Sequence, residues 1–200
     1  MLSIVKEKRG FSYVEVLSVI TVIVILSTVA IANMRIGSSP SELFVAAQKI
    51  ISDIRLTQNM AISASDFEGV IPGGGWGVRF VKGQNYYSLY ADIADDYGAS
   101  DHVCHANCND TSEELYKNID LPPDTTIDKI YLIRTIDGAE ISVDEATVTF
   151  EPPDPKVHMC QAVIDCGYDK FGIVVVNSNL DKREIIVNFF GLVDTKDVYY

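Results

Sequence analysis

The feature that most constrains this sequence is an apolar run near its start, which extends from Phe11 to Ile36 and reads FSYVEVLSVITVIVILSTVAIANMRI. As a helix this run would be about 39 Å long, enough to cross a hydrocarbon core of about 30 Å with some tilt. The run contains one acid, Glu15, close to its beginning. A charge inside such a segment is costly, so the position of this acid requires an explanation.

Charge is distributed unevenly along the chain, whose formal net charge is -12. Basic residues between Lys6 and Arg9 precede the apolar run, and acids dominate after it. The positive-inside rule therefore predicts that the first residues lie in the cytoplasm and that the C-terminal domain lies outside. The sequence thus predicts a single-pass protein of the inner membrane, with a transmembrane segment at 11–36 and an extracytoplasmic domain at 37–200.

Two other interpretations of the N-terminus stay open. One is a cleaved secretory signal, for which the tripeptide Ala30-Ile31-Ala32 offers a small-residue cleavage site. The other is a plain membrane anchor that is not cleaved. The secretory signal is disfavoured because its apolar region is usually only about 7–15 residues long. Glu15 also falls where that region should be most apolar.

The stretch RGFSYVEVLSVITVIVILS resembles the N-terminus of type IV prepilins and type II secretion pseudopilins. In that family a short basic leader ends in Gly, and a Phe, a Glu five residues into the mature chain and an unbroken apolar helix follow. Gly10, Phe11 and Glu15 match this pattern position by position. The resemblance implies that a prepilin peptidase removes residues 1–10 as a leader and that the new amine of Phe11 is methylated.

The resemblance also implies a role for Glu15 in assembly. In a helical stack of such subunits its carboxylate can pair with the Phe11 amine of a neighbour, so that opposite charges neutralise in a low-dielectric core. An acid that reaches out to solvent without a partner is the alternative. Many major pilins have a proline about two-thirds of the way along this helix, and residues 11–36 contain none. This difference favours a minor subunit.

The next segment, GSSPSELFVAAQKIISDIRLTQNMAIS, predicts an amphipathic helix at about 40–64. Ser39 can act as its N-cap, Pro40 suits the first helical position and Glu42 completes a capping box. Apolar residues then recur at helical spacing and form a stripe that we expect to pack on a sheet. The stripe consists of Leu43, Ala47, Ile50, Ile54 and Ala61.

The range 73–200 is rich in β-strand signals. Its first two runs, GGGWGVRFV and NYYSLYAD, are separated by KGQ and predict a hairpin. Six more follow between Gly, Asp, Asn and Pro clusters: IDKIYLIRT, AEISV, ATVTFEP, VHMCQAVI, FGIVVVN and REIIVNFFGLV. The predicted fold class is therefore α+β and pilin-like, with a long N-terminal transmembrane α-helix packed on an antiparallel β-sheet domain.

Within the pilin superfamily the chain looks most like the GspH/FimT group of minor pilins and pseudopilins. That group has a helix followed by strands of the types GWG, F-x-P and R-x-I-x-V-x-x-x-G. The matching positions here are Trp76, Phe150, Pro152, Arg183, Ile185, Val187 and Gly191. The range of about 94–124 falls outside this pattern and looks like an insertion.

The resemblance implies a structural subunit that is assembled through its N-terminal helix into a type IV pilus or a type II secretion pseudopilus, at initiation or at the tip. Its partners would be other pilin subunits, the prepilin peptidase and the inner membrane. The alternative function is an extracytoplasmic binding module, such as an adhesin or a DNA-uptake pilin, that uses the 94–124 insertion. The chain has no recognisable catalytic constellation, so we expect no enzyme and no cofactor.

No nucleic-acid partner is predicted, because phosphate contacts need clustered basic residues and this chain is acidic. Some members of the GspH/FimT group bind DNA through basic residues near the C-terminus. Here the sequence GLVDTKDVYY offers only Lys196, which lies between two acids.

The four cysteines, Cys104, Cys108, Cys160 and Cys166, predict two disulfides in an oxidising compartment, with three possible pairings. A competing hypothesis is a zinc site built from thiolates and imidazoles, because every histidine lies within two residues of a cysteine. The histidines are His102, His105 and His158. Free thiols, and calcium at the acidic runs DIADDYGASDH and CNDTSEE, are further alternatives.

Overall fold

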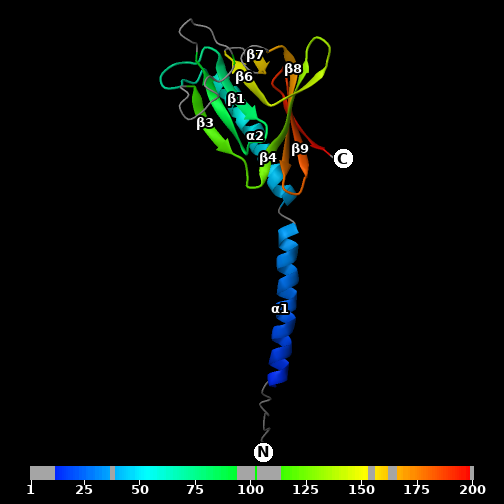
Figure 1. Ribbon diagram of the computed structural model, residues 1–200. Helices are drawn as coiled ribbons and strands as arrows, with labels where there is room; N and C mark the ends of the chain where they lie inside the picture. Colours follow the sequence, from blue (N-terminus) through cyan, green and yellow to red (C-terminus); the bar gives the residue numbers. More distant parts are fainter. Residues whose placement is uncertain are drawn as a thin grey trace, which may run out of the picture. The chain divides into compact units, whose positions relative to one another are not determined.

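The computed structural model describes residues 12–36, 39–93, 102, 114–152, 156–161 and 166–198, with the backbone alone for 30–36 and 39–41. The chain divides into two compact units, Met1–Ser39 and Pro40–Tyr200. The first unit contains helix α1 (Tyr13–Ile36), and the second contains nearly all of helix α2 (Ser39–Ile62) together with the strands (Figure 1).

The first sheet has the strand order β3-β2-β1-β6-β7, and each neighbouring pair is antiparallel. Because β2 and β6 both pair with β1, they run parallel to each other. Their C-terminal ends therefore lie at the same end of the sheet. The strands are β1 (Gly75–Val81), β2 (Tyr86–Asp92), β3 (Leu115–Asp120), β6 (Glu145–Glu151) and β7 (Lys156–Cys160).

The second sheet has the order β10-β9-β8-β4-β5 and is also antiparallel throughout. Its strands are β4 (Thr125–Arg134), β5 (Glu140–Val143), β8 (Tyr168–Asn177), β9 (Lys182–Asn188) and β10 (Val193–Val198). The sheets meet where the turn after β1 reaches β4. There the Gly83 amide donates to the Ile127 carbonyl over 2.7 Å, and the Ile127 amide donates to the Gln84 carbonyl over 3.0 Å.

A hydrophobic cluster joins α2 to both sheets. The predicted apolar stripe of α2 is confirmed as a core face, since its five members are at most 4% exposed. Phe80 of β1 packs on Phe171 of β8, with ring centroids 5.4 Å apart, and so connects the sheets directly. Each fully buried aliphatic side chain, such as Ile50 or Ile54, contributes about 1.5–3 kcal/mol. The predicted hairpin is confirmed as β1 and β2.

The predicted fold class is wrong. Over the described residues the structure is mostly antiparallel β, with two five-stranded sheets in place of the predicted single sheet under a long N-terminal helix. α1 ends at Ile36 and α2 begins at Ser39, and the helical residues of the core cluster come from α2. A set of strands this large favours two packed sheets over one twisted sheet.

The predicted transmembrane segment and the single-pass inner-membrane localisation are also corrected. Among the described residues, none of the helices has both the length and the hydropathy that a membrane span requires. The sequence estimate counted all of 11–36 as one apolar segment. The described helix begins only at Tyr13 and has Glu15 in its first turn.

The expected insertion at 94–124 is partly regular structure. Its end contains β3, which pairs with β2 at the edge of the first sheet. The alternation of apolar and polar residues in β3 is too weak for the strand to be recognised from sequence. Only Ile119 is buried among its central residues. Apart from His102, residues 94–113 lie outside the described part of the chain.

Candidate functional site

Helix α1 presents apolar side chains around its whole circumference. Every described side chain from Tyr13 to Val29 is exposed in this chain. The large apolar ones range from 47% exposed at Val16 to 81% at Tyr13. An apolar surface of this size on a single helix is unfavourable in water unless other protein or lipid covers it.

Three hydroxyl groups of α1 bond to the backbone of their own helix. Ser18 donates to the Val14 carbonyl, Thr21 to the Leu17 carbonyl and Thr28 to the Ile25 carbonyl, each over 2.8 Å. Bonds of this kind satisfy the hydroxyl within its own helix. The helix therefore needs no polar partner for these groups when it is buried.

Glu15 carries the only charge in Tyr13–Val29, and it lies in the first turn of α1. A carboxylate at this end of a helix is favoured by the helix dipole. The predicted cleavage and methylation residues, Gly10 and Phe11, lie outside the described residues. Their roles, like the pairing of Glu15 with a neighbouring amine, stay predictions.

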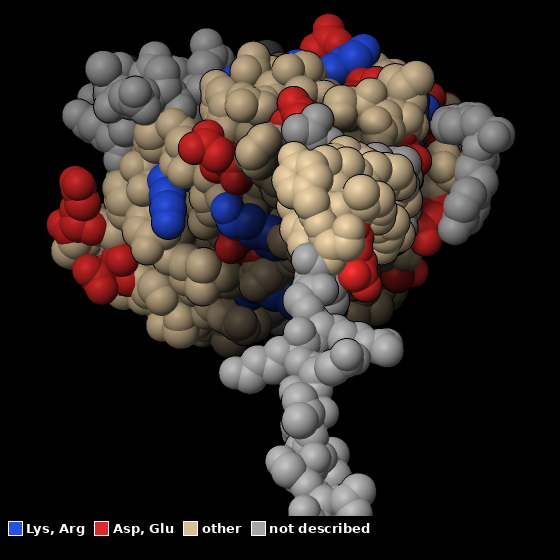
Figure 2. Space-filling model, turned by 90° about the horizontal axis from the view of Figure 1, so that it is seen from below, with Lys and Arg blue, Asp and Glu red and all other residues tan. Residues whose placement is uncertain are grey.

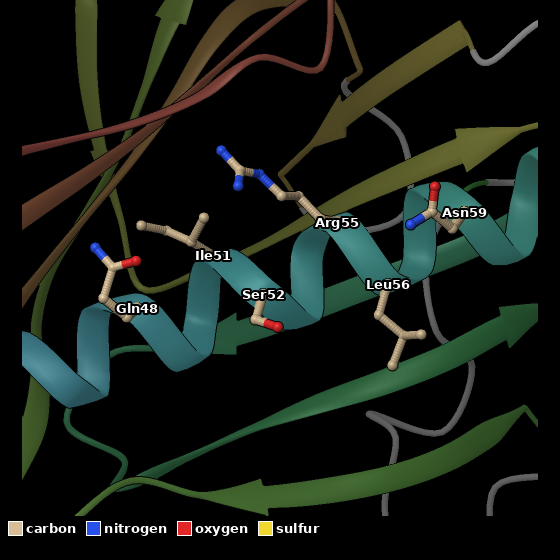
Figure 3. A pocket seen from close by; sticks show the side chains of 6 residues that line it. All are labelled: Gln48, Ile51, Ser52, Arg55, Leu56 and Asn59. Atoms are coloured by element: carbon tan, nitrogen blue, oxygen red, sulfur yellow. The ribbon is translucent and has the colours of Figure 1, made fainter.

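The outer face of α2 carries a second group of exposed apolar side chains. Phe44, Val45 and Leu56 are 48%, 55% and 44% exposed. Beside Leu56, an open hollow of about 310 Å³ follows this face of the helix (Figure 3). It is lined by Gln48, Ile51, Ser52, Arg55, Leu56 and Asn59.

The positions that carry the resemblance to the GspH/FimT group have structural roles in the second unit. Trp76, Phe150, Ile185 and Val187 are at most 1% exposed and belong to the core cluster. Gly191 adopts a positive φ of 74°, and its carbonyl accepts a hydrogen bond from the Gln58 side chain over 3.0 Å. These five residues therefore have structural roles in the second unit.

Cys160 and Cys166 form a disulfide, which is the local pairing. The crossed pairings are therefore excluded for these two residues, and neither offers a thiolate to a metal. Cys104, Cys108 and His105 lie outside the described residues. The hypothesis of a zinc site built from thiolates and imidazoles is therefore unsupported at Cys160 and Cys166.

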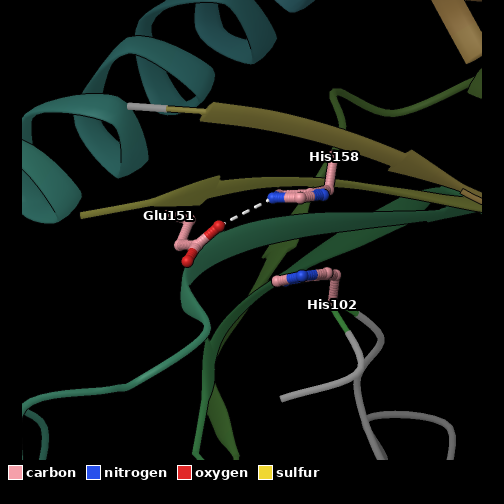
Figure 4. A group of neighbouring side chains, drawn as sticks. All are labelled: His102, Glu151 and His158. Carbon is pink, nitrogen blue, oxygen red and sulfur yellow. Dashed lines mark hydrogen bonds and ion pairs between the residues drawn. The ribbon is translucent and has the colours of Figure 1, made fainter. Parts of the chain in front are cut away.

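The other two histidines meet at one edge of the first sheet (Figure 4). The rings of His102 and His158 are stacked, with centroids 3.7 Å apart and 10° between their planes. His158 projects from β7, and its Nε2 lies 2.9 Å from Glu151 Oε2. Asp92 is fully buried, and its Oδ2 lies 3.3 Å from His102 Nδ1. We call His102, Glu151, His158 and Asp92 the histidine cluster.

Three hydroxyl groups fix residue 102 against the sheet. Tyr90, Thr147 and Thr149 contact the carbonyl oxygen of His102 at 2.8, 3.1 and 2.9 Å. The amide of His102 in turn donates to Asp92 Oδ2 over 2.9 Å. Residue 102 is thereby held at a left-handed φ of 62°, although it is not a glycine.

The histidine cluster has asymmetric electrostatics. Interaction with the Asp92 side chain raises the pKa of His102. Burial lowers the pKa of His158, and the hydrogen bond from His158 lowers the pKa of Glu151. The cluster therefore favours one charged and one neutral imidazole, because two stacked imidazolium rings would repel each other.

Sequence reasoning noticed the histidines but missed the two carboxylates. It associated each histidine with its nearest cysteine, whereas the structure brings two of them to Asp92 and Glu151, the last residues of β2 and β6. The parallel direction of β2 and β6 could have indicated that Asp92 and Glu151 lie close together. That direction follows from the pairing order of the strands, which the sequence does not reveal.

Charged side chains on the face shown in Figure 2 are dispersed. On the part of the face that Figure 2 shows and the structure describes, Lys and Arg side chains are separated by acidic and uncharged ones.

Comparison with known proteins gave no match to a family model, to a curated protein or to a solved structure.

Proposed function

We propose that this chain is a minor pilin or pseudopilin, a structural subunit assembled through α1 into a type IV pilus or a type II secretion pseudopilus. The observation that carries the proposal is the apolar, exposed surface of α1 with a single carboxylate in its first turn. The resemblance of the N-terminal sequence to prepilins supports the same function.

The physical argument begins with the burial of α1. A helix that is apolar on all sides is stable only when its surroundings are apolar as well. Copies of the same helix, packed side by side along a filament, provide such surroundings for every subunit in turn. A stack of identical subunits is a heterologous assembly, which propagates into a filament when its rotation does not close.

Glu15 would set the register of this packing. In a bundle of α1 helices its carboxylate would lie in a low-dielectric core, where an unpaired charge is strongly unfavourable. Cleavage after Gly10 would create a positive amine on Phe11, four positions before Glu15. Pairing of this amine with Glu15 of a neighbouring subunit neutralises both charges only at one axial offset.

The second unit would then form the outer part of the filament. The exposed apolar side chains on α2, including Phe44 and Leu56, provide surface for contact with neighbouring subunits. Within the chain, the Phe44 ring stacks against Arg183, whose guanidinium carbon lies 4.8 Å from the ring centroid.

A charge placed within α1 tests the proposal. We expect Val22→Lys to reduce recovery of the chain in sheared filaments by at least about tenfold, because a lysine would be buried among apolar helices. Ile136→Lys is the matched control, since Ile136 is 91% exposed in the second unit. Quantitative immunoblotting of filament and cell fractions measures both. Equal recovery of the two variants would contradict assembly through α1.

A further inference from the structure

We propose that His102, His158 and Glu151 bind a divalent transition-metal ion, with Zn²⁺ the best match, at the edge of the first sheet. Each residue offers one ligand atom, and these atoms all lie within 4.8 Å of one another. The site is independent of the assembly function and uses none of the residues assigned to it.

The geometry is close to that of a zinc site. Ligand atoms on one tetrahedral Zn²⁺ lie about 3.3 Å apart, given Zn–N and Zn–O distances of about 2.0–2.2 Å. His158 Nε2 and Glu151 Oε2 are 2.9 Å apart. They need to separate by only about 0.4 Å to lie on one tetrahedral ion. Side-chain rotation of His102 out of the ring stack brings its nitrogen closer. The side chains of His158 and Glu151 are 25% and 33% exposed, so an ion can reach them from solvent.

Asp92 supports the proposed site through its contact with the His102 ring. Its fully buried carboxylate lies against Nδ1 of His102, which leaves Nε2 as the ring nitrogen available to a metal. A carboxylate behind a histidine ligand fixes the tautomer and orientation of the ring and makes the nitrogen more basic. Among the described residues, neither the buried Oδ1 of Asp92 nor His102 Nδ1 has a hydrogen-bond partner. Both atoms gain from a hydrogen bond that forms once the ring reorients around an ion.

The charges of the cluster also suit a dication. Two neutral imidazoles with the carboxylates of Glu151 and Asp92 carry a total charge of about -2 when both acids are ionised. A dication bound between these side chains balances this charge.

The ligand types select the class of metal. Imidazole nitrogen together with a carboxylate suits Zn²⁺, Cu²⁺, Ni²⁺ and Fe²⁺, whereas Ca²⁺ and Mg²⁺ prefer oxygen ligands alone. The described cysteines are joined in a disulfide, so no sulfur ligand comes from them. Three protein ligands leave a tetrahedral ion with one open position, where water or a group from another molecule can bind.

Zinc titration of the purified full-length chain in detergent tests this site. We expect one Zn²⁺ to bind per chain and neither Ca²⁺ nor Mg²⁺ to compete at tenfold excess. Glu151→Gln and His158→Gln should each weaken binding by at least about a hundredfold, since each removes a direct ligand. Asp92→Asn should weaken it by about 10–100-fold through His102.

Two matched variants serve as controls. His105→Gln removes the chain's remaining histidine, and Glu140→Gln removes a carboxylate on β5; both should bind zinc as the unmodified chain does. Fluorescence of Trp76, the only tryptophan, checks that every variant is folded. X-ray absorption of the zinc complex should show nitrogen and oxygen ligands at about 2.0–2.2 Å.

Several outcomes would overturn the proposal. These are the absence of saturable zinc binding, unchanged affinity in folded His158→Gln, a loss in His105→Gln equal to that in His158→Gln, or a sulfur shell at about 2.3 Å. In the first case the histidine cluster would be an ion-paired group of side chains alone.

Discussion

Glu15→Gln is expected to remove this chain from filaments while leaving its second unit folded. The substitution keeps the size of the side chain and abolishes its charge, so the Phe11 amine of the neighbouring subunit would be buried without a partner. Loss of one member of a buried ion pair is more costly than absence of both. We expect recovery in sheared filaments to fall by about a hundredfold or more.

Glu42→Gln is the matched control for this experiment. Glu42 is the acid in the first turn of α2, as Glu15 is in the first turn of α1. It lies on an exposed position of the second unit, so its loss should leave filament recovery within about twofold of the unmodified chain. If Glu15→Gln assembles as well as Glu42→Gln, Glu15 has no partner in the filament and the pairing is wrong.

The largest expected loss of stability comes from Gly75→Ala. Gly75 opens β1 at a φ of 97°, a conformation that side chains rarely adopt. An added Cβ would lie 2.7 Å from the carbonyl carbon of Phe150 and still closer to its oxygen. Both atoms belong to the backbone of β6, so the strand itself would have to move. Backbone strain and overpacking together should lower the free energy of unfolding by about 3–5 kcal/mol.

Gly83→Ala separates the two causes. Gly83 has a similar φ of 80°, but a Cβ there would meet no atom within 4 Å. Its substitution should therefore lower the free energy of unfolding by only about 1–2 kcal/mol, from backbone strain alone. Urea unfolding followed by the fluorescence of Trp76 measures both variants. A difference below about 1 kcal/mol between them would mean that β1 and β6 tolerate the extra atom.

Local periodicity was sufficient to predict α2 and most of the strands. The stripe from Leu43 to Ala61 repeats at helical spacing, and it is the buried face of the helix. The runs FGIVVVN and REIIVNFFGLV overlap the strands β8 and β9. In these elements the apolar side chains themselves provide the burial that stabilises the structure, so the sequence pattern and the fold have the same cause.

The edge strands β3 and β10 could not be predicted in the same way. β10, with the sequence VDTKDV, has charged and polar residues at most positions and is held by its pairing with β9. β3 is held in a similar way by β2. Backbone hydrogen bonds to a neighbouring strand form these elements, and the sequence of the strand alone does not show which neighbour it has.

The division into two sheets depends on contacts between distant residues. The sequence analysis expected one antiparallel sheet packed beneath the N-terminal helix, because the strand runs alone do not show how they divide between sheets. The histidine cluster also depends on long-range contacts, because it combines Asp92 of β2 with Glu151 and His158 more than fifty residues later. Such juxtapositions follow from strand order, which local patterns do not encode.

The mass of the mature N-terminus tests the central claim most directly. If the chain is a pilin-type subunit, intact-mass and peptide analysis of the protein isolated from its producing cells will show a chain that begins at Phe11 and carries a methyl group on its amine. A chain that begins at Met1, or one cut after Ala32 to begin at Asn33, would contradict the account.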